Sequence, residues 1–204
     1  YCQNCIRDLA LVRAERDLGH DAVIVPLYLP LTGDDPSFEV DTPVFFGAVN
    51  TYLHQNMPLY SHAPRWVKRM VDSPRFLEWA ARRSGSTRSS GLEEMTLSML
   101  RGEEGVQAKG LDALVAWLSK TGKPDVVHLS NGLLVGVARR IRQELRVPVV
   151  CSLQDEDSWV DAMDARYARI VWEVLSDRAK DVDVFVAISR YYAGVMQKRL
   201  GVAP

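Results

Sequence analysis

The chain has 204 residues, of which 47% are hydrophobic, so it is long enough to bury the core of one large domain. Its 25 lysines and arginines nearly balance its 26 aspartates and glutamates, which argues against a nucleic acid attracted by overall charge. The 3 cysteines, an odd number, favour a reducing compartment, so we expect a cytoplasmic protein without a disulfide framework. The longest apolar run, residues 22–31, contains two prolines and is too short to span a bilayer.

The first segment predicts a helix followed by a buried strand. Apolar residues recur at helical spacing from Gln3 to Leu18, and Gly19 is the residue type that commonly ends a helix. Residues 22–29 are almost all apolar, which is typical of a strand buried on both faces of a parallel sheet. A second short strand is expected over 43–47.

The last third of the chain alternates predicted strands and helices. The expected strands cover residues 125–130, 147–153 and 183–189, and the expected helices cover residues 133–145, 159–180 and 190–200. Short turns between these elements indicate a parallel α/β sheet of the Rossmann-like type, wound by right-handed crossovers. Residues 50–120 break this alternation, and we interpret them as a helical insertion within the domain.

Within that insertion, residues 64–83 predict a basic helix that contains Trp66 and Trp79. Such a helix either lies on an anionic membrane surface or covers the flank of the sheet with a solvated charged face. A Ser- and Gly-rich segment, 84–91, follows as a flexible joint and leads into further amphipathic helix.

Ligands of an open parallel sheet bind beyond the carboxyl ends of its strands, where helices begin. The polar residues at these points are Ser130, Asn131 and Gly132 after one strand, Gln154 to Asp157 after the next, and Ser189, Arg190 and Tyr191 after the last. Gln3 and Asn4 open the first helix and are expected to face the same crevice.

Four blocks together resemble the N-terminal half of family 4 retaining glycosyltransferases of the GT-B fold. They are Leu18–Asp21, Pro124–His128, Pro148–Val150 with the polar pair that follows, and Val186–Tyr191. Such enzymes hold the sugar acceptor mainly in an N-terminal Rossmann-type lobe and the nucleotide-sugar donor mainly in a C-terminal lobe, without a metal. The resemblance implies the acceptor lobe of a hexosyltransferase with no cofactor, a nucleotide-sugar co-substrate, and a glycan or lipid-linked acceptor.

The resemblance also implies that residues 1–204 are one acceptor-side domain without its first strand and without the donor lobe. The sequence lacks an initiator Met, so we expect it to begin inside a longer gene product and to be inactive alone. Where the family usually has His after the strand 147–153, this chain has Gln154, which can hydrogen-bond but cannot act as a general base.

These expectations give a set of candidate site residues. Gln154 and Asp155 are the candidate catalytic residues. The candidate contacts to acceptor or donor are Gln3, Asn4, Asn131, Gly132, Ser189 and Arg190. If the basic helix 64–83 touches lipid, the protein is peripheral to the inner face of the membrane and its acceptor is lipid-linked.

Other interpretations stay open. Cys2 and Cys5 form a C-x-x-C pattern at a helix start, which a thiol oxidoreductase also has. The acidic run 155–157 fits either a metal site or the first turn of a helix, where carboxylates are favoured. His128 is expected to be a core or supporting histidine within its strand. The competing function is a non-catalytic α/β module that binds a small ligand or a partner protein at the same edge.

Overall fold

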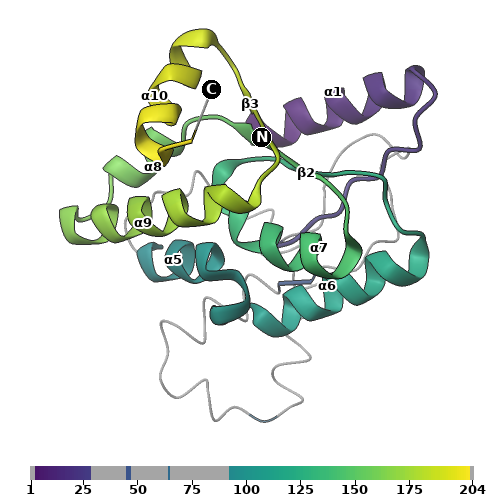
Figure 1. The fold of residues 1–204 in the computed structure, drawn as a ribbon, viewed down its shortest axis with the longest axis horizontal. Coiled ribbons are helices and arrows are strands. Elements are labelled where there is room, and N and C mark those ends of the chain that lie inside the picture. The colour runs from purple at the N-terminus through teal and green to yellow at the C-terminus, as the bar shows by residue number, and fades with distance from the viewer. Residues whose placement is uncertain (1–2, 29–44, 47–63, 65–91, 203–204) are drawn as a thin grey trace. The chain divides into compact units, whose positions relative to one another are not determined.

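A computed structural model describes residues 3–28, 45–46, 64 and 92–202 of the chain (Figure 1). The chain consists of two compact units, Tyr1–Ser86 and Thr87–Pro204. Cys2, the basic helix expected over 64–83 apart from Pro64, and the joint 84–91 lie outside the described residues.

In the first unit, helix α1 spans Gln3–Asp17, which confirms the predicted helix. Gly19 follows it with a φ of 90°, a backbone conformation that glycine adopts at little cost, and its N–H donates to the carbonyl of Arg16.

The strand predicted over 22–29 is wrong for its described part, because residues 20–26 have neither helix nor strand and 27–28 form a bend. A strand needs a ladder of backbone hydrogen bonds to a neighbour. Here the carbonyl of Ala22 accepts from Arg16 Nε at 2.8 Å, and Pro26 has no N–H to donate. Phe45 and Phe46, the described part of the second expected strand, also form a bend, with the ring of Phe46 packed edge-on against Tyr28.

The second unit contains a parallel three-stranded sheet in the order β1-β2-β3, with β1 at Val127–Leu129, β2 at Val149–Leu153 and β3 at Val184–Ala187. Val127 pairs with Val149, and Val150 pairs with Val184. Each strand lies inside its predicted range, and the predicted class, a parallel α/β fold of the Rossmann-like type, is confirmed.

The helices after β1 and β2 begin earlier in the chain than predicted, whereas the helix after β3 begins where it was predicted. A 3₁₀ helix, η4, at Gly132–Val137 precedes α7 at Ala138–Leu145, and α10 covers Arg190–Leu200. The single helix expected over 159–180 is instead α8 at Glu156–Asp161, α9 at Ala165–Arg178 and the short η5 at Ala179–Asp181. The break occurs because Asp164 caps α9: its Oδ1 accepts from Arg166 N at 2.9 Å.

Three further elements belong to the same unit: α5 at Glu93–Arg101, η3 at Gly102–Glu104 and α6 at Ala108–Thr121. Helix α5 contacts η4 and α9, and α6 contacts α7 (Figure 1). The described end of the segment 50–120 therefore packs onto the helices that cover the sheet. Gly102 and Gly136 allow this packing, because a Cβ on Gly102 would overlap the carbonyl oxygen of Gly136.

The core of this unit lies between β2 and its neighbouring helices. Val149 and Cys151 are fully buried, Leu153 nearly so, and β2 contacts both η4 and α7. Within the described ranges, no helix is both long enough and apolar enough to cross a membrane.

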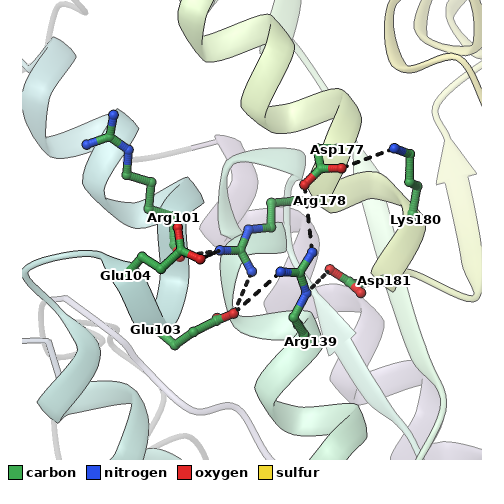
Figure 2. A network of polar contacts seen from close by, with 8 residues as sticks. All are labelled: Arg101, Glu103, Glu104, Arg139, Asp177, Arg178, Lys180 and Asp181. Carbon is green, nitrogen blue, oxygen red and sulfur yellow. Dashed lines mark hydrogen bonds and ion pairs between the residues drawn. The ribbon is translucent and has the colours of Figure 1, made fainter.

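A cluster of charged residues, the arginine cluster, ties the helices of this unit together (Figure 2). Arg178 in the last turn of α9 donates to Glu103 Oε1 at 2.8 Å and to the carbonyl of Arg101 at 2.6 Å. Arg139 in α7 donates to Asp181 at 2.9 Å and lies 3.6 Å from Glu103. Burial alone would raise the pKa of Glu103, but the hydrogen bond from Arg178 and the two positive charges lower it.

Candidate functional site

The carboxyl ends of β1, β2 and β3 meet at one edge of the sheet, which we call the carboxyl edge. Asn131 and Ser189, two predicted site residues on it, begin helices. The Oδ1 of Asn131 accepts from Leu133 N at 3.0 Å at the start of η4, and the Oγ of Ser189 accepts from Tyr192 N at 3.1 Å at the start of α10. Both side chains therefore have a capping role that any ligand contact would share.

Glu156, the first residue of α8, joins the three loops of this edge. Its side chain is only 1% exposed. Its Oε1 accepts from Gly132 N at 2.7 Å, and its Oε2 accepts from the Tyr192 hydroxyl at 2.8 Å. The backbone N–H of Glu156 donates back to the Tyr192 oxygen at 2.9 Å. One carboxylate thus connects residues that follow β1, β2 and β3.

This arrangement fixes the surroundings of Gly132 and Tyr192. The N–H of Gly132 is already engaged by Glu156, and a Cβ at residue 132 would lie 3.0 Å from Glu156 Cγ. Burial, the hydrogen bond to Glu156 and the negative charges of Glu156 and Asp157 all raise the pKa of Tyr192. Tyr192 therefore keeps its proton and can donate to the carboxylate.

The two candidate catalytic residues lie between β2 and α8. Gln154 is half-buried, and Asp155 is exposed. Asp155 has a φ of 60°, in the left-handed region that Asp tolerates better than most residues, and its side chain makes no capping hydrogen bond to α8. Its carboxylate is therefore not used by the helix that it precedes.

The rest of the acidic run begins a helix, although the Glu156 side chain also connects the loops. Glu156 and Asp157 occupy the first turn of α8, as the helix-start interpretation predicts. Further along, Asp161 accepts two hydrogen bonds from Arg199, at 2.9 and 2.6 Å. Across the described residues, no group of three or more His, Cys, Asp or Glu is arranged to hold a metal ion.

The remaining predicted residues lie at two helix starts. Arg190 and its neighbour Tyr191 are exposed in the first turn of α10, at the carboxyl edge. Gln3 and Asn4 open α1, which belongs to the first unit. The structure thus brings Asn131, Gly132, Gln154, Asp155, Ser189 and Arg190 to one edge of one sheet.

Sequence reasoning missed the importance of Glu156 and Tyr192. Glu156 stands in the acidic run but has no sequence feature that distinguishes it from the acids beside it. Burial of a charged residue is rare without partners, and those partners lie 24 and 36 residues away in sequence. His128 is exposed, so it is not the core histidine that was one of its two expected roles; its Nε2 lies 2.9 Å from Ser152 Oγ on the neighbouring strand.

Comparison with known proteins places this fold in a family. No curated protein and no solved structure gives a significant match to the chain. The family model described as "Glycosyl transferase 4-like domain" matches residues 7–204, which is nearly the whole chain and includes every element of the carboxyl edge. The chain therefore belongs to the family of glycosyl transferase 4-like domains.

Proposed function

We propose that this chain is the acceptor-binding lobe of a hexosyltransferase, which moves a sugar from a nucleotide-sugar donor to a glycan or lipid-linked acceptor. The observation that carries the proposal is the gathering of polar side chains from three successive loops at the carboxyl edge, in a chain of this family. Sheets of this kind bind their ligands at that edge.

Gln154 and Asp155 take the central role in this proposal. The exposed carboxylate of Asp155, which its own helix does not use, accepts a hydrogen bond from an acceptor hydroxyl. The amide of Gln154 both donates and accepts, so it fixes the orientation of that hydroxyl relative to the anomeric carbon of the donor. The contribution to the rate is positioning, because an amide cannot remove a proton as a general base.

Three further residues of the edge complete acceptor binding in the proposal. Asn131 and Ser189 each use one oxygen to cap a helix, and each oxygen has a second lone pair for a sugar hydroxyl. Arg190 is exposed and supplies several N–H donors beside them. Gln3 and Asn4, at the start of α1, contact the donor phosphates through the partial positive charge of a helix N-terminus.

The donor is bound mainly by a second lobe, no metal is required, and the anomeric configuration of the sugar is retained. These three parts of the proposal rest on the family resemblance alone. The protein works in the cytoplasm, at the inner face of the membrane if its acceptor is lipid-linked.

The test is a transfer assay on the complete product of the gene and on the 204-residue chain alone. Both are incubated with UDP-, GDP- and ADP-hexoses, with a panel of oligosaccharides and with a polyprenyl phosphate, and products are identified by mass spectrometry. We expect transfer by the complete product, none by the chain alone, and a loss of about tenfold or more in Asp155→Asn, since a charge-assisted hydrogen bond is lost. Glycan binding without transfer by either protein would support the non-catalytic module instead.

A further inference from the structure

We infer that Glu156 and Tyr192 are positioning residues, which hold the three loops of the carboxyl edge at a fixed spacing for the acceptor. The inference about the acceptor rests on the proposed function. The connection between the loops through Glu156 and Tyr192, which we call the lock, rests on the hydrogen bonds alone. Neither residue needs to touch substrate. Their effect passes through Gly132, Asp155 and Ser189, which are next to them in the chain or bonded to them, and through Gln154, which directly precedes Asp155.

The lock is built from hydrogen bonds that engage both carboxylate oxygens of Glu156. Glu156 accepts one hydrogen bond on each carboxylate oxygen, at 2.7 Å from Gly132 N and 2.8 Å from Tyr192. The Tyr192 oxygen accepts from Glu156 N at 2.9 Å and also lies 3.2 Å from Asp157 Oδ1. A buried carboxylate is costly unless such donors surround it, so the loops cannot separate without exposing an unpaired charge.

The positions of these residues connect the lock to the candidate site. Glu156 directly follows Asp155 in the chain, and Gly132 directly follows Asn131. Tyr192 belongs to the turn whose N–H groups Ser189 caps. Each ligand-binding loop therefore has one of its own residues in the lock.

A second set of contacts joins the far ends of the same two helices. Arg199 of α10 pairs with Asp161 of α8, and its guanidinium lies 4.6 Å from the centre of the Trp172 ring. The indole N–H of Trp172 also donates to Asp161 at 2.9 Å. Helices α8 and α10 are thus held together at both ends, so a shift of one moves the loop before the other.

The experiment compares Glu156→Ala, Glu156→Gln and Tyr192→Phe with Val171→Ala, a matched control. Val171 is fully buried in α9, and its aliphatic side chain cannot take part in the hydrogen bonds of the lock. Hydrogen exchange of single amides is measured in the 204-residue chain. In the complete gene product, kcat and the acceptor KM are measured with the best oligosaccharide of the transfer assay.

We expect Glu156→Ala to speed exchange of the amides of residues 132 and 156 by about tenfold or more. The Gly132 amide loses its acceptor, and the residue 156 amide loses the carboxylate that holds its acceptor, the Tyr192 hydroxyl, in place. Tyr192→Phe removes the acceptor of the residue 156 amide but leaves the Gly132 bond, so only residue 156 exchanges faster. Glu156→Gln restores an acceptor for Gly132 and behaves like the wild type there. The acceptor KM rises about tenfold in Glu156→Ala and much less in Glu156→Gln.

Val171→Ala lowers thermal stability but changes neither the exchange pattern at the edge nor the acceptor KM. If the amides of residues 132 and 156 exchange at the same rate in Glu156→Ala as in Val171→Ala, the lock does not exist. Faster exchange with an unchanged acceptor KM would overturn the positioning role. If the wild type transfers no sugar, the proposed function fails, and the exchange data alone still decide whether the lock exists.

Discussion

Two buried charged side chains organise the second unit, and they are satisfied in different ways. Glu156 at the carboxyl edge is held by a backbone N–H and a phenol, which are neutral donors. Arg178 in the arginine cluster is held by a carboxylate and a carbonyl, and Arg139 adds three more carboxylate contacts beside it (Figure 2). The edge thus relies on directed hydrogen bonds, whereas the cluster relies on charge. Salt should weaken the cluster more than the edge, since it screens ion pairs.

The largest effect is expected from Arg178→Ala. Arg178 is only 3% exposed, and its loss removes the short hydrogen bond to Glu103 and the one to the Arg101 carbonyl, so that Glu103 keeps only the longer contact to Arg139. We expect a loss of about 3 kcal/mol in the free energy of unfolding, measured by urea denaturation. Lys180→Ala, which breaks the exposed pair with Asp177, is the control and should change little. A similarly small change in the free energy of unfolding of both variants would mean that the arginine cluster does not stabilise the fold.

Tyr192→Phe should cost about 1–2 kcal/mol near neutral pH, because the Glu156 carboxylate and N–H both lose a partner. The pKa of Tyr192 is raised in the folded state, whereas the unfolded chain ionises near pH 10. Its stabilising contribution is therefore complete below pH 10 and declines as the pH rises above 10.

Denaturation series at several pH values between 8 and 11 test this pH dependence. The wild type should lose stability above pH 10 more steeply than Tyr192→Phe does. Tyr28, whose pKa is raised by burial in the first unit, is present in both proteins and so cancels in the comparison. If the free energy of unfolding falls equally with pH in both proteins, the pKa of Tyr192 is the same in the folded and unfolded states.

Asn131→Ala and Ser189→Ala should each cost about 1 kcal/mol, because each removes the side-chain cap of a helix. Asn131→Asp and Ser189→Asp should recover most of that stability, since a carboxylate also caps. Thermal unfolding of the four proteins checks the stability, and acceptor binding checks the site. If the Asp variants recover stability but not acceptor binding, the native side chains do more than cap.

The smallest effect is a gain. Asp155 and Arg146 both have positive φ values, 60° and 53°, in the left-handed region. Replacing either with glycine should stabilise the fold by about 0.5 kcal/mol, because glycine adopts this conformation without steric strain. Arg146→Gly at the end of α7 is the matched control, which should leave sugar transfer unchanged. A transfer rate unchanged in Asp155→Gly as well would remove Asp155 from the catalytic candidates.

Among the described residues, the sequence predicts the second unit better than the first for a physical reason. Runs such as 147–153 are apolar, short and bounded by polar turns, and the structure forms each of them as a strand of one sheet. Residues 22–29 have the same composition, yet composition does not reveal that Arg16 takes the carbonyl of Ala22. Strand formation depends on a partner, and a partner is not a local property.

The carboxyl edge shows the same limit. The rule about strand ends selects the loops that follow β1, β2 and β3, and the structure brings these loops together. The rule does not distinguish Asp155, which is exposed, from Glu156, which is buried, because both are acids at the start of a helix. The break between α8 and α9 is missed for a related reason: Asp164 caps a new helix inside an otherwise continuous helical pattern.

The contact between Gly102 and Gly136 restricts how the sequence of this family member can change. At both positions the obstacle to a side chain is main chain: the carbonyl of Gly136 in one case, and those of Met99 and Leu100 in the other. A clash with a side chain can be relieved by trimming that side chain, but a clash with a carbonyl cannot. Trimming a neighbouring side chain should therefore not suppress the effect of an alanine at either glycine.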